Sequence, residues 1–112
     1  MSSIPPWIVE RRKHIRTKVK GSFKWIRCND LGKKYIGDVV DIGFGGIKFH
    51  TNRLNDLDVG EIVTVVFDSL MGRIIRISMI EGHKMEVVVE FLADDNLMSN
   101  VLELMCRFIS VD

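Results

Sequence analysis

Two short segments of the chain carry side chains whose types and spacing could bind an anion and a flat base. Arg12 and Arg16 stand four residues apart near the N-terminus, and Arg11 precedes them directly. A guanidinium group donates two parallel hydrogen bonds to a phosphate or to O6 and N7 of guanine, and its flat face stacks on a purine. These arginines therefore suit a guanine nucleotide.

The second segment reads Asp41-Ile-Gly-Phe-Gly-Gly-Ile47. A carboxylate such as that of Asp41 accepts hydrogen bonds, and guanine offers two donors side by side, its N1–H and N2–H2 groups. Glycines at 43, 45 and 46 let the backbone turn sharply and let a flat base approach without meeting a Cβ atom. Donors from the first segment and an acceptor from the second could together contact two edges of guanine.

Positive charge is concentrated around the first segment although the whole chain is nearly neutral. The formal net charge is +1, yet eight of the sixteen Lys and Arg residues fall between positions 11 and 27, with no acidic residue among them. They are Arg11, Arg12, Lys13, Arg16, Lys18, Lys20, Lys24 and Arg27. A local cluster favours recognition of an anion at one place, whereas the weak overall charge argues against a protein that coats long nucleic acid. A solvated basic segment that binds nothing specific is the alternative.

Segments in which apolar and polar residues alternate are bounded by turn-forming residues, and this pattern predicts antiparallel strands. These strands are the elements that must position the two segments. We expect six strands, at 17–27, 34–42, 47–51, 61–68, 73–81 and 84–92, with turns at 29–32, 43–46, 69–72 and 81–83. In the first strand Val19, Phe23 and Trp25 share one face and the lysines share the other. Regularly spaced strands of this kind predict a barrel or a sandwich, because closing a sheet removes its exposed edges.

The last segment changes to the period of a helix. Asp94-Asp95-Asn96 supply capping side chains, after which apolar residues recur at helical spacing. These residues are Leu97, Val101, Leu104 and Phe108. The wide apolar face of this C-terminal amphipathic α-helix suits the covering of one open end of a barrel, and contact with a partner chain is the other possibility.

Length and composition suit one domain. We expect residues 1–9 to form a flexible N-terminal arm and residues 10–112 to form the domain. Cys28 and Cys106 are far apart and lack metal-ligand spacing, so free, buried thiols in a reducing cytoplasm are expected. The first residues lack the pattern of a secretory signal, and no apolar run approaches the ~20 residues of a membrane span. The expected protein is soluble and cytoplasmic.

The sequence contains no constellation typical of an enzyme. His14, His50 and His83 are scattered, without a His-x-x-x-His or Cys-x-x-Cys spacing, and no nucleophile stands in a recognisable elbow. The glycines at 43–46 do not fit a dinucleotide-binding fingerprint, which needs a further glycine where Lys48 stands. We therefore expect a binding protein without catalytic residues, cofactor or metal.

The two segments resemble the two motifs of the PilZ domain family. Arg12-Lys13-His14-Ile15-Arg16 matches Arg-x-x-x-Arg, and Asp41-Ile42-Gly43-Phe44-Gly45-Gly46 is similar to Asp/Asn-x-Ser-x-x-Gly. The resemblance covers about residues 10–110. It implies a mainly β fold, a six-stranded antiparallel β-barrel with a C-terminal helix, and a receptor for the bacterial second messenger cyclic di-GMP.

Carried over residue by residue, the resemblance implies a site made of Arg11, Arg12, Arg16, Asp41, Gly43 and Gly46. Arg12 and Arg16 would hold phosphate and guanine, Asp41 would bond a guanine edge, and Gly46 would keep the turn open. Arg11 resembles the extra arginine of those members that bind two stacked nucleotides. Gly43 stands where the motif has serine, and one lost hydrogen bond is worth about 0.5–1.5 kcal/mol, or about two- to tenfold in affinity.

Three functions remain open at this point. The first is a cyclic di-GMP receptor that changes conformation and partner surface on binding, with a downstream protein partner of unknown identity. The second is a PilZ-like adaptor that binds a protein but not the nucleotide. The third, a basic barrel for single-stranded nucleic acid, is disfavoured because Phe23 and Trp25 lie on the face opposite the lysines. None of the three requires insertion into a membrane.

Overall fold

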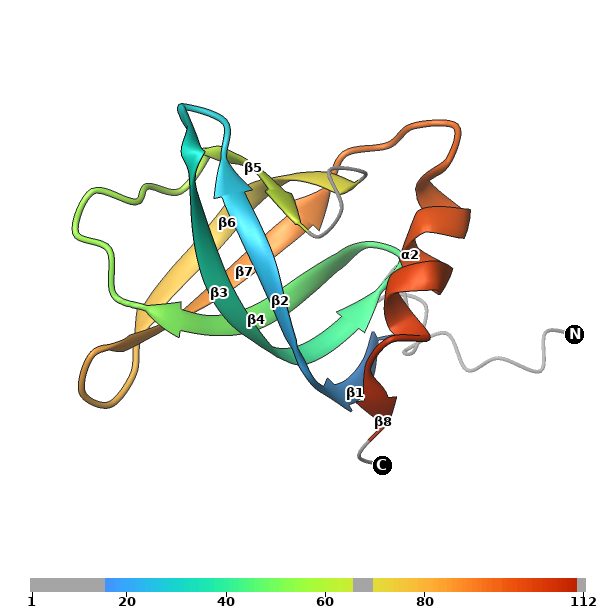
Figure 1. Ribbon diagram of the computed structural model, residues 1–112, viewed down its shortest axis with the longest axis horizontal. Helices are drawn as coiled ribbons and strands as arrows, with labels where there is room; N and C mark the ends of the chain where they lie inside the picture. Colours follow the sequence, from blue (N-terminus) through green and yellow to red (C-terminus); the bar gives the residue numbers. More distant parts are fainter. Residues whose placement is uncertain (1–15, 66–69, 111–112) are drawn as a thin grey trace, which may run out of the picture.

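The computed structural model describes residues 16–65 and 70–110, which form a β-barrel with one helix at its end (Figure 1). The elements are β1 (Arg16–Lys20), β2 (Ser22–Arg27), β3 (Asp30–Gly43), β4 (Gly46–Asn52), β5 (Ile62–Val65), β6 (Leu70–Met79), β7 (Lys84–Phe91), α2 (Leu97–Met105) and β8 (Ile109–Ser110). The expected arm at 1–9, together with Arg11 and Arg12, lies outside the described residues.

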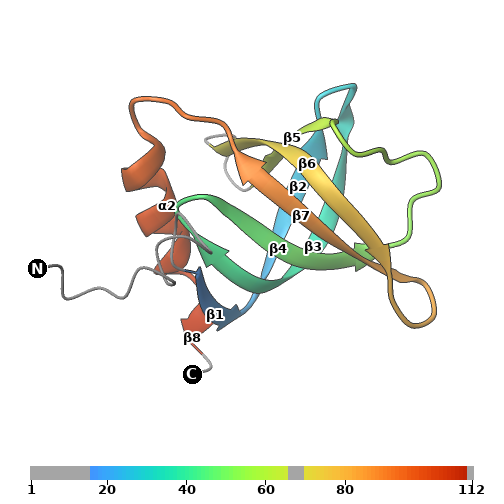
Figure 2. The same ribbon diagram turned by 180° about the vertical axis from the view of Figure 1, so that it is seen from behind.

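Six of the strands close into an antiparallel barrel, as expected. Their order around the barrel is β2-β5-β6-β7-β4-β3, and pairing of β2 with β3 closes the ring. β1 adds to β3 outside the ring, and β8 adds to β1. Seen from behind, the β6–β7 hairpin and the loop between β4 and β5 lie at the barrel end away from α2 (Figure 2).

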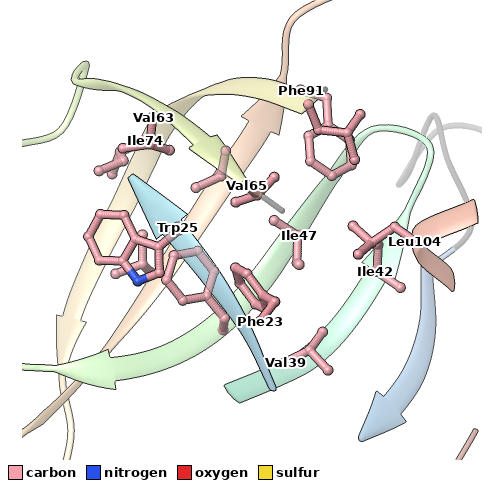
Figure 3. Packing of buried hydrophobic residues seen from close by; sticks show 14 of the residues in the cluster. Phe23, Trp25, Val39, Ile42, Ile47, Val63, Val65, Ile74, Phe91 and Leu104 are labelled. Atoms are coloured by element: carbon pink, nitrogen blue, oxygen red, sulfur yellow. The ribbon is translucent and has the colours of Figure 1, made fainter. Parts of the chain in front are cut away.

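Most of the core is built from the side chains that the period-two pattern places on one face of a strand. β6 is an exception, because a bulge between Ile74 and Arg76 leaves Ile74 buried and Ile75 and Met79 exposed. Phe23 and Trp25 of β2 point into the barrel while Lys24 is exposed, so the predicted separation of aromatic and basic faces is confirmed. The Phe23 ring meets Phe49 edge to face at a centroid distance of 5.0 Å. Trp25 is fully buried, and its indole N–H donates to Thr51 Oγ1 at 3.3 Å. Figure 3 shows this packing from close by.

Helix α2 covers one end of the barrel, which is the first of its two predicted roles. Val101 and Leu104 are buried against β3 and β6, and Phe108 continues the same apolar cluster beyond the helix. The predicted cap is only partly right, because Asn96 makes no side-chain cap. Instead, the Asn96 backbone N–H donates to Asp94 Oδ1 at 2.7 Å.

Several of the predicted element boundaries are wrong. The turn expected at 29–32 overlaps β3, which begins at Asp30. The strand expected at 17–27 is divided at Gly21, where a Cβ atom would lie 2.5 Å from the Phe108 ring. The turn expected up to Gly72 is also wrong, because Gly72 lies inside β6 and pairs with Val63 and Phe91. A Cβ at Gly72 would meet Val89 and the Glu90 carbonyl, so this glycine permits close strand packing and does not mark a turn.

Both cysteines are exposed, so the prediction of buried thiols is wrong. Cys28 follows β2 directly, and Cys106 follows the last residue of α2. Each cysteine stands at the end of an element, where the chain leaves the core. No disulfide joins them, since both thiols are free.

Arg27, counted above in the basic cluster, is instead a buried residue at the end of β2. Its Nη1 donates to Asp56 Oδ1 at 3.0 Å, its Nη2 donates to Glu61 Oε2 at 3.1 Å, and its Nε donates to Glu61 Oε1. Hydrogen bonding to Glu61 and then to Asp56 raises the pKa of Arg27 above its usual range. This ion cluster ties the loop between β4 and β5 to the barrel.

Replacement of Arg27 by methionine should strongly destabilise the barrel. The change leaves Glu61, whose side chain is only 13 % exposed, without its cation. We expect the free energy of unfolding to fall by about 3 kcal/mol or more. Urea denaturation at pH 7 measures this, with Lys24→Met on the exposed face of the same strand as the matched control. A loss below about 1 kcal/mol would show that the cluster adds little.

The Asp56–Arg27 pair should make stability depend on acid pH. The hydrogen bond from Arg27 lowers the pKa of Asp56 in the folded state. Its contribution is therefore present above the unfolded pKa of about 3.9 and is lost as the pH falls through the folded value. Wild type should exceed Asp56→Asn in stability at pH 6, and the gap should close below about pH 4.

Denaturation of both proteins at several pH values measures this gap. Asp95→Asn, which removes an exposed carboxylate elsewhere, is the control. A gap between wild type and Asp56→Asn that stays constant from pH 6 to the acid range would contradict the assignment.

Candidate ligand-binding site

The pairing of β1 with β3 brings the two candidate segments together. Arg16 stands directly opposite Gly43, and Lys18 stands opposite Asp41. Positions more than twenty residues apart in the sequence thus become cross-strand neighbours. The junction lies outside the closed ring at the barrel end that carries α2, with β1 below the helix in both views (Figures 1 and 2).

Asp41 points away from the core and lies between two lysines. Its neighbour Ile42 is fully buried in the barrel, so the Asp41 side chain lies on the outer face. Lys48 stands opposite Asp41 on β4, and its Nζ is 3.8 Å from Asp41 Oδ2. The Asp41 and Lys48 side chains are 14 % and 23 % exposed. On the other side, Lys18 of β1 is exposed to solvent.

The glycine segment makes the connection between β3 and β4. β3 ends at Gly43 and β4 begins at Gly46. Among the described residues, glycines with a positive φ are Gly60 and Gly82, so the glycines at 43–46 turn the chain without a left-handed conformation. The Gly45 carbonyl accepts a hydrogen bond from the Phe91 N–H at 2.9 Å, which fixes the connection to β7.

Gly46 has a packing role that the sequence did not reveal. A Cβ atom at this position would lie 2.2 Å from the carbonyl oxygen of Val89 on β7. No side chain fits there unless β4 and β7 separate. The requirement for glycine at 46 therefore follows from strand approach, independently of any ligand.

The structure thus brings together four of the six predicted site residues. They are Arg16, Asp41 and Gly43, which lie where β1 pairs with β3, and Gly46, which begins β4 shortly after Gly43. Arg11 and Arg12 precede the described residues. Lys48 was missed because its place beside Asp41 depends on strand pairing, and the one available signal was the alternation in 47–51, which puts it on the outer face. The exposed lysines of β1, Lys18 and Lys20, remain near the junction, whereas Arg27 is removed from the cluster by burial.

No group of three or more His, Cys, Asp or Glu side chains in residues 16–65 and 70–110 is placed to hold a metal ion. No helix within these ranges combines the length and the apolar character needed to cross a bilayer.

Both the sequence and the fold of this chain are similar to those of known proteins. The PilZ domain family matches the sequence over residues 10–108. The chain belongs to the PilZ domain family. Among solved structures, this PilZ domain is similar to one described as the PilZ domain with c-di-GMP of YcgR from Escherichia coli. The TM-score is 0.62 at 13% sequence identity, and the match covers 87% of this chain and 90% of that chain. No curated protein sequence matches.

At this level of identity the similarity to YcgR shows a shared fold. The expected fold class, a six-stranded antiparallel barrel with a C-terminal helix, is confirmed by the strand order of this PilZ domain. The roles of the individual site residues remain predictions.

Substitution of Gly46 by alanine should destabilise the PilZ domain because the new methyl group meets backbone and not a movable side chain. We expect a loss of about 2 kcal/mol in the free energy of unfolding. Gly32→Ala is the matched control, since the nearest atom to a Cβ there is 4.0 Å away. Urea denaturation of both variants measures the difference. Equal stability of the two variants would rule out the proposed contact with Val89.

Proposed function

We propose that this PilZ domain is a receptor for cyclic di-GMP, bound on the outer face where β1 meets β3. The observation that carries the proposal is the β1–β3 register, which sets Arg16 opposite Gly43 and next to the strand position of Asp41. Membership of the PilZ family and the nucleotide named in the YcgR structure support the choice of ligand.

The chemistry of the junction suits the two parts of this ligand. Arg12 and Arg16 would bond to its phosphates and stack on or bond to guanine, as guanidinium groups do. Asp41, on the outer face, would accept from N1–H and N2–H2 of one guanine. Gly43 offers a backbone without a Cβ in place of the motif serine, so one side-chain hydrogen bond is missing. Arg11 would favour a second, stacked nucleotide.

Ligand binding would change the surface of the domain around β1. Contacts from Arg11 and Arg12 to the nucleotide would fix residues 10–15 against β1 and β3 at a cost in conformational entropy. The charge-assisted bonds of the arginines must exceed that cost. The surface formed by these residues and the bound nucleotide is what a downstream protein would recognise.

A second candidate function is an adaptor that binds a protein and not the nucleotide. The glycine at position 43 favours it, because this position lacks the hydroxyl group of the family motif. In that case the exposed lysines of β1 and β2 would contact an acidic protein surface. A titration of the nucleotide distinguishes the two functions.

Isothermal titration calorimetry with cyclic di-GMP tests the receptor. Wild type should bind with micromolar or tighter affinity, and Arg16→Ala should weaken binding about ten- to hundredfold through loss of charge-assisted bonds. GMP is the control ligand, and Lys24→Ala is the control for removal of one positive charge from the barrel surface. Two nucleotides per chain are expected, falling to one in Arg11→Ala.

The absence of any heat at two temperatures, from protein shown to be folded, would reject the receptor in favour of the adaptor. Saturation of wild type at one nucleotide per chain would reject only the role given to Arg11 and would leave the receptor proposal intact.

A further inference from the structure

Lys48 lies on the outer face of β4, with Asp41 across from it on β3. Its ammonium group pairs with Asp41 at 3.8 Å. Its strand neighbour on the other side is Val88 of β7. Val88 shares the outward face of β7 with Glu86 and Glu90, yet it is only 8% exposed. The residues directly opposite Val88 are Lys48 and Arg76, and the methylene stems of such long side chains can cover a neighbouring apolar residue.

Binding of guanine at Asp41 would release the ammonium group of Lys48. The N1–H and N2–H2 groups of guanine engage both oxygens of a carboxylate, and one of these oxygens faces Lys48. Another carboxylate nearby, that of Glu86, is already bonded to His50 at 3.0 Å and lies 3.7 Å from Arg76. The freed cation would then lie beside a ligand whose ring contains two phosphodiester groups.

We propose that Lys48 is a further ligand-binding residue of this site, whose ammonium group transfers from Asp41 to a phosphate of the nucleotide. The flexible four-carbon stem of lysine permits this movement while its inner methylenes stay on Val88. The transferred charge also offsets the repulsion between Asp41 and the incoming phosphates. This inference rests on the proposed function and extends it to a residue outside both sequence motifs.

A double-mutant cycle between Lys48 and Asp41 tests the transfer. Lys48→Met keeps the methylene cover over Val88 but removes the charge, and Lys48→Arg keeps the charge. With cyclic di-GMP as the titrant, Lys48→Met should weaken binding about ten- to hundredfold, and Lys48→Arg should stay close to wild type. Because the contact is with the ligand, Lys48→Met should cost a similar factor in an Asp41→Asn background.

Lys24→Met is the matched control, since Lys24 is exposed on β2 and pairs across the strands with Ile36, away from Asp41. Raising the salt concentration should weaken the binding of wild type more than that of Lys48→Met. Unchanged or tighter binding by Lys48→Met would overturn the proposal. Lys48 would then pair with Asp41 and make no contact with the nucleotide.

Loss of the Lys48→Met effect in the Asp41→Asn background would also overturn the transfer and would leave Lys48 as a residue that positions Asp41. A wild type that does not bind the nucleotide at all contradicts the proposed function itself, and the titration of wild type alone shows that result.

Discussion

Antiparallel pairing of β1 with the end of β3 is the constraint on which the candidate site depends. β1 lies outside the closed ring, begins at Arg16 and pairs along one edge with β3. The register sets Arg16 opposite Gly43 and Lys18 opposite Asp41. A shift by one residue would move Asp41 and its partners to opposite faces of the sheet. β8 adds to the other side of β1 and helps to hold this register.

Closure of the barrel gives each strand an inner face that packs in the core and an outer face toward the surface. The strands send most of their apolar side chains into one core, and charged residues lie on the outer face of several strands. Lys18, Asp41 and Lys48 form one such row across β1, β3 and β4. At the other end of the barrel, Arg27 shows the opposite solution, in which a cation is buried and satisfied by two carboxylates. The same residue types therefore serve stability at one end and suit ligand recognition at the other.

Local patterns in the sequence predicted the strands and the helix, because period two and helical spacing follow directly from which side chains must be buried. Properties that depend on contacts between distant strands were missed. Gly72 looked like a turn residue but accommodates Val89 and Glu90, and Gly46 was assigned to the ligand although Val89 already requires it. Lys48 belongs to neither sequence motif, and the register of β3 with β4 is what places it beside Asp41. The Arg-x-x-x-Arg segment and the Asp41 segment could be assigned to one site from the sequence because both resemble motifs of one family.

Mapping of the bound nucleotide by ¹H–¹⁵N NMR tests the central claim most directly, since it asks where the ligand lies as well as whether it binds. During titration with cyclic di-GMP, the amide signals of Arg16, Asp41 and Gly43 should shift together. The signal of Gly82, in the hairpin at the far end of the barrel, should not move. Shifts centred on Gly82, or no shifts at the β1–β3 junction at saturation, would contradict the account.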